Sequence, residues 1–117
     1  MRISQDKLHP SLKNQIIKTL AQTLVDLKEV EEAHTFLQDF FNESELLTFA
    51  KRLSIAYWLK KGRSYTNIKQ NLKVSSATIA SVQSQMHKTG IGLALKKLEA
   101  EEWASVWAEK IRKFVRK

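Results

Sequence analysis

The chain has 117 residues, a formal net charge of +8 at pH 7, three glycines, one proline and no cysteine. This length supports one domain but no large enclosed active site, and the lack of cysteine excludes a disulfide framework and a thiolate metal site. The opening MRISQDKLHPS lacks the apolar core of a secretion signal, and no stretch approaches eighteen apolar residues, so we expect a cytoplasmic protein without membrane partners.

The positive charge is concentrated in the middle of the chain. Residues 46–98 contain ten lysines and arginines but no aspartate or glutamate, whereas the rest of the chain holds all twelve acids. A positive field without opposing acids attracts a polyanion such as nucleic acid. The alternative is a solvated lysine-rich surface, although such surfaces normally mix both signs.

Apolar residues at three- and four-residue spacing, with little glycine or proline, predict an all-α fold of about six helices. Pro10 suits the first turn of a helix, and the pattern after it predicts an amphipathic helix over about 11–28. A second helix is predicted over about 30–41.

A third helix is predicted over about 43–61. Asn42 or Ser44 can cap its start, where acidic residues also favour the helix dipole. The segment is apolar almost all round, which predicts burial on more than one side. Gly62 would end it as a left-handed cap.

Residues 64–86 predict two short helices joined by a tight turn. Ser64 can cap the first helix, and Ser75 or Ser76 can cap the second. Counted from Tyr65, five apolar residues occupy positions four, eight, ten, fifteen and eighteen, which is the spacing of a helix-turn-helix. They are Ile68, Leu72, Val74, Ile79 and Val82.

Two lysines depart from the usual helix-turn-helix pattern. Lys69 stands where a small residue is common, and Lys73 stands where the turn usually has glycine. A lysine in a left-handed turn costs about 1 kcal/mol, which its charge can offset by reaching a phosphate. Phosphate contacts are also expected from Lys60, Lys61 and Arg63.

The second helix of this motif has an outer face of small polar and methyl-bearing side chains. Such groups let the helix approach base edges closely, and the lack of arginine leaves part of the specificity to DNA shape. A helical hairpin that only packs is the alternative. The outer face consists of Ser76, Ala77, Thr78, Ser81 and Gln85.

A last amphipathic helix is predicted over about 91–116, after a break at Gly90 and Gly92. Its apolar face includes Trp103 and Trp107, whose exposure to water would be costly. We expect a second copy of the chain to cover them, which makes the protein a homodimer. Burial within one chain is the alternative.

Two segments together resemble the Trp repressor superfamily, and more closely its branch of short, uncharacterised Trp-repressor-like proteins. The first is a long central helix that ends in glycine, NESELLTFAKRLSIAYWLKKG; the second is a helix-turn-helix that contains Ala77-Thr78-Ile79, SYTNIKQNLKVSSATIASV. The likeness covers roughly residues 30–90. It implies an intertwined homodimer whose two helix-turn-helix heads bind double-stranded DNA.

The resemblance also implies roles for single residues. Thr66 and Lys69 would approach the DNA backbone, and the residues from Ser75 to Thr78, with Ala80, would lie against the bases. Together with the outer face and Lys73, the predicted DNA-binding residues are Thr66, Lys69, Lys73, Ser75, Ser76, Ala77, Thr78, Ala80, Ser81 and Gln85.

A possible effector pocket follows from the same resemblance. Arg52 matches a central-helix arginine that flanks bound tryptophan in the family, and Ser81 stands where a second arginine completes that pocket. Because serine supplies no cation, we expect no cofactor; a tryptophan-like corepressor is the alternative. The family's turn glycines are replaced by Lys73 and Ser75, and one residue is missing after Gly62.

We therefore expect one domain over 1–117, with a helical dimerisation scaffold over 11–62, a helix-turn-helix over 63–89 and a C-terminal amphipathic helix over 90–117. Scattered histidines and adjacent acids offer no metal site and no acid–base pair, so no enzymatic activity is expected. The predicted function is that of a dimeric repressor, a sequence-specific double-stranded DNA-binding transcription regulator. The alternatives are a basic module that binds structured RNA or an acidic protein, and an effector-responsive sensor.

Overall fold

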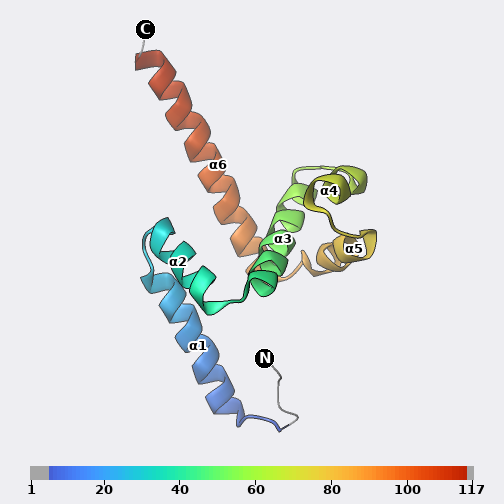
Figure 1. Cartoon of the computed structure of the whole chain (residues 1–117). Coiled ribbons are helices and arrows are strands. Elements are labelled where there is room, and N and C mark those ends of the chain that lie inside the picture. The colour runs from blue at the N-terminus through green and yellow to red at the C-terminus, as the bar shows by residue number, and fades with distance from the viewer. Residues whose placement is uncertain (1–5, 116–117) are drawn as a thin grey trace. The chain divides into compact units, whose positions relative to one another are not determined.

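The computed structural model describes residues 6–115, without the side chains of Trp107, Phe114 and Val115. The described residues form six α-helices and no strand (Figure 1), which confirms the predicted all-α fold. The helices are α1 (Pro10–Asp26), α2 (Val30–Phe40), α3 (Glu43–Lys60), α4 (Tyr65–Leu72), α5 (Ser76–Gln85) and α6 (Thr89–Val115). Within the described residues, none of these helices is long and apolar enough to cross a bilayer.

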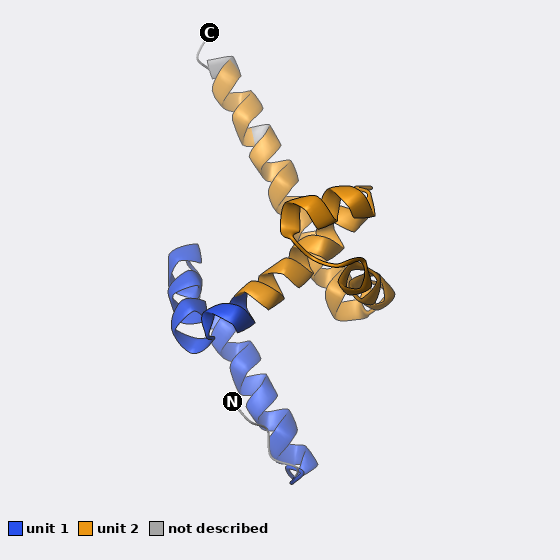
Figure 2. Ribbon diagram, turned by 45° about the vertical axis from the view of Figure 1, so that its right-hand side comes forward, with its two compact units in different colours: residues 1–46 blue, residues 47–117 orange. Residues whose placement is uncertain are grey.

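The chain divides into two compact units that meet between Leu46 and Leu47 (Figure 2). This boundary falls inside α3 and therefore differs from the subdivisions predicted after residues 62 and 89. The organisation of residues 1–117 as a single domain stays a prediction.

The first unit leaves the apolar face of α1 uncovered. The helix begins at Pro10, where the Nδ1 atom of His9 accepts the Ser11 N–H at 3.2 Å, and it ends two residues earlier than predicted. Five apolar side chains of this face are between 38% and 56% exposed in the single chain: Leu12, Ile16, Ile17, Leu20 and Leu24. A continuous exposed apolar face of this kind is typical of an interaction surface.

The start of α3 is closed by two reciprocal hydrogen bonds. The Glu45 N–H donates to Asn42 Oδ1 at 2.8 Å, and the Asn42 N–H donates to Glu45 Oε1 at 3.0 Å. Asn42 is thus the capping residue in a capping box. At the other end Gly62 has a φ of 87°, which confirms the predicted left-handed cap.

The burial predicted for α3 is wrong for much of its length in the single chain. Only Ile55 and Ala56 are buried. Leu47, Phe49 and Leu53 are 53%, 47% and 42% exposed, because no described element of the second unit covers them fully.

Three isoleucines from three helices form the core of the second unit. Ile55 on α3, Ile68 on α4 and Ile79 on α5 are each 0% exposed. Half-buried neighbours pack against them: Trp58, Leu59, Tyr65, Leu72, Val74 and Val82. All five apolar positions that defined the helix-turn-helix in the sequence therefore belong to this core. Full burial of each isoleucine contributes about 1.5–3 kcal/mol, which fixes α4 and α5 on α3.

The last helix begins earlier than expected. Gly90 and Gly92 lie inside the first turns of α6, so the predicted break before the helix is wrong. A glycine in a helix costs only about 1 kcal/mol, and burial of Leu95, which is 3% exposed, offsets that cost. Trp103 is 65% exposed in the single chain, and its cover by a second copy stays a prediction. Trp107 lies outside the residues whose side chains are described.

The turn between α4 and α5 holds Lys73 with φ 56° and ψ 54°, as predicted for a left-handed residue. Because this conformation strains a residue with a Cβ, Lys73→Gly is expected to raise the free energy of unfolding by about 1 kcal/mol. Urea denaturation followed by circular dichroism measures this. Lys69→Gly, inside α4, is the control and is expected to lower the free energy by about 1 kcal/mol. A loss of stability in both variants would contradict the role of strain.

Candidate nucleic-acid interface

Side-chain caps begin both helices of the helix-turn-helix. The Ser64 hydroxyl oxygen accepts the Asn67 N–H at 3.1 Å at the start of α4. The Ser75 hydroxyl oxygen accepts the Thr78 N–H at 3.1 Å at the start of α5. Ser75 is therefore the cap, and Ser76 is the first residue of the recognition helix. No acid lies in the first turn of α5, so the positive end of its dipole is unopposed.

Polar contacts hold α4 against its neighbours. The Tyr65 hydroxyl donates to Gln83 Oε1, which ties α4 to α5. The Arg63 guanidinium lies 4.0 Å from the centre of the Trp58 ring and donates to Asn67 Oδ1 at 3.4 Å. A cation–π contact at an exposed site contributes about 0.5–1 kcal/mol. Arg63 is thus already engaged with α3 and α4.

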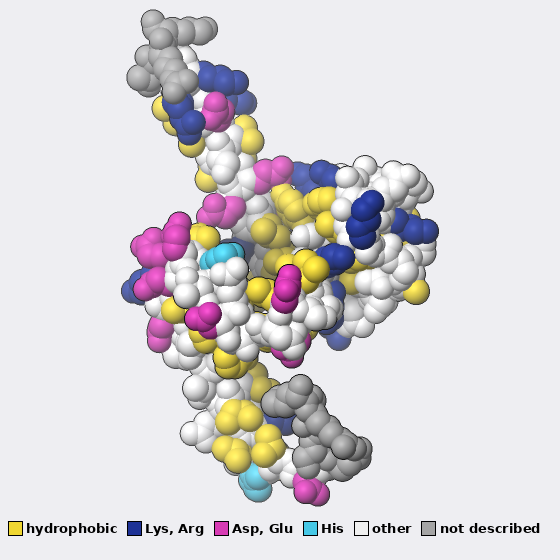
Figure 3. All heavy atoms as spheres, viewed as in Figure 1, with side chains coloured by type: hydrophobic (Ala, Val, Ile, Leu, Met, Phe, Trp, Pro, Cys, Tyr) yellow, Lys and Arg dark blue, Asp and Glu magenta, His cyan; other side chains and the backbone are white. Residues whose placement is uncertain are grey.

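Most of the predicted DNA-binding residues lie on the exposed surface of α4, the turn and α5. Figure 3 shows dark-blue basic side chains over this part of the molecule without magenta acidic ones. Thr78, on which direct base contact depends, is exposed. The exposed set comprises Thr66, Lys69, Lys73, Ser75, Ser76, Ala77, Thr78, Ala80 and Ser81.

Gln85 differs from the rest of the predicted set. Its side chain is half-buried and lines a cavity instead of lying on the outer face with Thr78. The reason is its helical phase, since residue 85 lies three positions after Val82 and shares its inward side. That spacing was present in the sequence and would have indicated the correct side.

The cavity beside Gln85 has a volume of about 200 Å³ and includes Arg52 at its wall. The other lining residues are Phe49, Leu53, Ala56, Val82 and Ile91, and Ser81 is not among them. The sequence predicted that Arg52 and Ser81 share a pocket. In the structure Arg52 shares the cavity with Gln85 instead. Apolar walls with one cation and one amide suit a small ligand that has an apolar body and a polar or anionic end.

Two lysines predicted to contact phosphate are paired with acids of α6. Lys60 Nζ lies 3.3 Å from Glu99 Oε1, and Lys61 Nζ lies 3.1 Å from Glu102 Oε2. These pairs reduce the positive charge that the two lysines present at the end of α3. The sequence offered no signal for them, because the partners are about forty positions apart along the chain.

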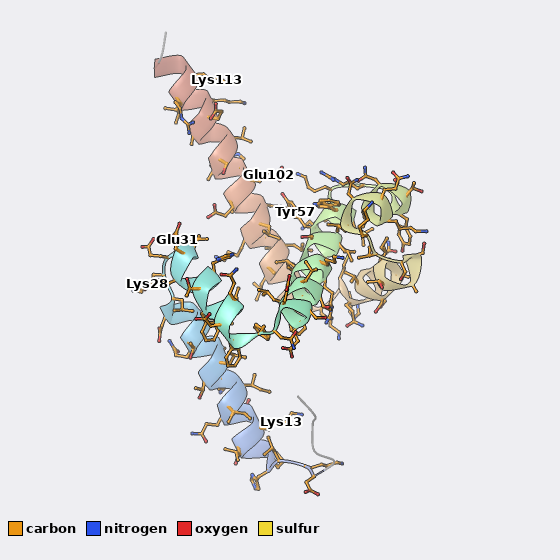
Figure 4. All side chains as sticks on the ribbon, in the orientation of Figure 1. Lys13, Lys28, Glu31, Tyr57, Glu102 and Lys113 are labelled. Atoms are coloured by element: carbon orange, nitrogen blue, oxygen red, sulfur yellow. The ribbon has the colours of Figure 1, made fainter. Side chains whose placement is uncertain are left out.

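Glu102 also joins α6 to α3 through Tyr57 (Figure 4). The Tyr57 hydroxyl donates to Glu102 Oε2, and this hydrogen bond raises the pKa of Tyr57. Hydrogen bonds from Tyr57 and Lys61 lower the pKa of Glu102, and the bond to Glu102 raises the pKa of Lys61. The three groups therefore stabilise one another in their charge states at neutral pH.

An exposed, capped second helix held by a buried isoleucine core defines a helix-turn-helix protein. The family model described as Trp repressor protein matches residues 15–99, and the chain belongs to this family. The resemblance noted in the sequence is thereby confirmed. The rest of α6, after Glu99, extends beyond the matched segment.

Two individual proteins are similar to this chain. The uncharacterized protein YerC of Bacillus subtilis (strain 168) is 31% identical over 72 residues, which make up 62% of this chain and 69% of that protein. The crystal structure of a TrpR like protein from Eubacterium eligens ATCC 27750 matches with a TM-score of 0.69 and 28% identity, covering 78% of this chain and 96% of that one.

The contact between α3 and α6 is expected to depend on pH. Because the folded pKa of Glu102 is lowered, its charge stabilises the fold at neutral pH, and this contribution is lost as the pH falls through that pKa. Glu102→Gln should therefore lower the urea midpoint at pH 7 but have little effect at a pH below the lowered pKa.

The control for this measurement is Glu109→Gln. Glu109 pairs with Arg112 at 3.0 Å within α6, so its removal leaves the contact with α3 unchanged. A difference between wild type and Glu102→Gln that stayed constant from neutral to acidic pH would contradict the assigned role.

Proposed function

We propose that this protein is a dimeric, sequence-specific double-stranded DNA-binding transcription regulator that acts as a repressor. The observation that carries the proposal is the exposed start of α5, which presents small hydroxyl and methyl groups within a segment that contains no acid. Membership of the Trp repressor family supports the same conclusion. A helix with such a surface fits the major groove, where its first residues reach base edges.

The residues of the motif divide into two roles. Lys69 and Lys73 are exposed cations without an ion pair among the described residues, and they supply contacts to phosphates that hold the protein in register. Thr78 and Ala77 face outward from the start of α5, where they contact bases such as thymine through their methyl groups. Thr66, at the start of α4, supports the backbone contacts.

The uncovered apolar surface supports a homodimer. Each chain exposes the face of α1 that includes Ile16 and Ile17, at 49% and 56%. On α6, Trp103 is 65% exposed. A second copy that covers these surfaces gives a symmetric dimer with two recognition helices, which read two half-sites about one helical turn of DNA apart.

The cavity lined by Arg52 and Gln85 supports control by a small effector as a second function. It lies directly behind the recognition helix, since Val82 and Gln85 of α5 form part of its wall. A ligand in this cavity changes DNA binding if its affinity differs between two orientations of α5, because it then shifts the population toward the orientation that it binds more tightly. An apolar carboxylate, such as an aromatic amino acid, fits the mixture of apolar wall and guanidinium.

The division of roles is tested with Lys69→Ala and Thr78→Ala on one panel of operator fragments. Lys69→Ala is expected to weaken binding to all fragments alike and to reduce the slope of log affinity against log salt by about 0.9. Thr78→Ala should instead change the order of preference among fragments. Footprinting and fluorescence anisotropy measure both effects.

Identical effects of the two variants would reject the division of roles. A preference of the wild type for structured RNA over duplex DNA in the same assay would reject the proposed function.

The effector is tested by the thermal shift of the protein with a panel of amino acids and small carboxylates. A ligand of the cavity should raise the melting temperature of the wild type, and Arg52→Ala should abolish that rise because the guanidinium partner is lost. Arg112→Ala, which removes an arginine of α6 outside the cavity, is the control and should retain the shift. A shift that persists in Arg52→Ala would exclude this cavity as the site.

A further inference from the structure

The last part of α6 lies beyond the segment that the family model matches, which ends at residue 99. We call residues 99–113 of this helix the extension. From residue 101 onward every described side chain of the extension is exposed in the single chain. Large apolar side chains are among them, with Trp103 at 65%, Val106 at 48% and Ile111 at 59%. A helical segment of this length that is exposed on all sides is only marginally stable in water, so we expect a partner to cover it.

Charge is distributed unevenly along the extension. Acids occupy its first turn and bases its last turns: Glu99, Glu101 and Glu102, then Lys110, Arg112 and Lys113. Figure 4 shows Glu102 and Lys113 in separate turns of α6, with Glu102 on the part that lies next to α3. Glu109 departs from this pattern and pairs with Arg112 at 3.0 Å. A helix with opposite charges toward its two ends attracts a copy of itself that runs in the opposite direction.

Part of this charge pattern lies along one stripe of the helix. Its members follow one another at spacings of three or four residues, which places them on the same side: Glu99, Glu102, Val106, Lys110 and Lys113. The stripe is symmetric about Val106, because an acid and a lysine lie four residues on either side of it and a second such pair lies seven residues away. In an antiparallel pair with its two-fold axis at Val106, each acid therefore faces a lysine of the other copy. In a parallel pair, like charges would face each other.

A cleft beside the stripe is able to receive a lysine of the second copy. It has a volume of about 380 Å³ and is lined by Lys61 at the end of α3 and by Glu99, Glu102, Trp103 and Val106 of α6. The ion pairs with α3 involve Oε1 of Glu99 and Oε2 of Glu102. A carboxylate has acceptor sites for more than one cation, so a lysine of the partner can share these acids. The Trp103 ring provides an apolar surface against which the stem of that lysine packs.

We propose that the extension of α6 binds the extension of a second copy, antiparallel and centred on Val106. The inference deepens the proposed homodimer, on which it rests for the partner, and adds a direction and a register to it. Val106 meets its own counterpart, and Lys110 of each copy lies against Glu102 of the other. The exposed apolar side chains of the two helices then cover one another. An anionic lipid surface would attract the basic end of the extension but repel the acids of the stripe, so a second copy is the better match.

The direction of the pair is tested with single thiols introduced into the full chain, which contains no cysteine of its own. With a short bismaleimide cross-linker, Val106→Cys is expected to give a covalent dimer. Ala108→Cys, on the other side of the helix, is the control and should give little. Lys113→Cys alone should also give little, because two copies of this residue lie about 21 Å apart along the axis in the antiparallel register, at about 1.5 Å per residue. A mixture of Lys113→Cys with Glu99→Cys should cross-link.

Two results would overturn the inference. Cross-linking of Lys113→Cys to itself as efficiently as to Glu99→Cys indicates a parallel pair. Equal cross-linking of Val106→Cys and Ala108→Cys indicates that the stripe has no specific contact.

The charge pattern is tested by sedimentation equilibrium of the full chain at low salt. Lys113→Glu is expected to raise the dissociation constant of the dimer about tenfold, because the two-fold axis places a like charge opposite Glu99 at two places in each dimer. Arg112→Glu makes the same change of charge at the neighbouring residue, outside the stripe, and should have a smaller effect. Equal effects of the two variants would contradict the proposed register.

Further results separate this inference from other occupants of the extension and from the proposed function. If the wild type floats with vesicles that contain phosphatidylglycerol while Val106→Cys gives no covalent dimer, the extension binds a lipid surface and the inference is overturned. If Val106→Cys gives no covalent dimer although the protein is dimeric and binds duplex DNA, the inference fails and the proposed function remains. If the expected cross-links form but the wild type binds no duplex, the proposed function fails and the α6 contact remains.

Discussion

The second unit depends on one contact, the meeting of Ile55, Ile68 and Ile79 at the junction of α3, α4 and α5. Few other described side chains of this unit are fully buried, so the placement of the helix-turn-helix relies on these three and on the half-buried residues around them. The contact also sets the helical phase of α5. With Ile79 inward, Thr78 must point outward and Val82 must face α3. The exposed recognition surface and the cavity beside Arg52 are therefore two consequences of the same packing.

Tertiary structure separates the lysines at the end of α3 from those near the recognition helix. Those at the end of α3 are paired with acids of α6, and the Tyr57–Glu102 hydrogen bond strengthens that contact. Those near the recognition helix, Lys51, Lys69 and Lys73, lack an ion pair among the described residues. Lys51, Lys69 and Lys73 consequently keep their full positive charge near α5. Such a distribution favours binding of a polyanion beside this helix.

Each unit, taken by itself, also exposes apolar surface. In the first unit this is the face of α1, and in the second it includes Leu47, Phe49 and Leu53 of α3 with Trp103 of α6. Burial of such side chains contributes about 25 cal/mol per Å² of apolar surface. In the proposed homodimer a second copy would cover such side chains and add to the stability of each chain.

The sequence by itself determined the existence of the six helices, the cap at Ser64, the left-handed positions of Gly62 and Lys73, and the five core positions of the helix-turn-helix. These features depend on interactions between residues a few positions apart, or on a spacing that is typical of one motif. They can therefore be predicted without knowledge of the tertiary structure. Only the tertiary structure decided that Lys60 and Lys61 pair with α6, that Gln85 and not Ser81 joins Arg52, and that Lys51 meets the turn at Lys73. Those contacts join residues distant in sequence, and their existence depends on the angles at which the helices pack. The charge pattern and the apolar periodicity of the sequence do not determine the angles between packed helices.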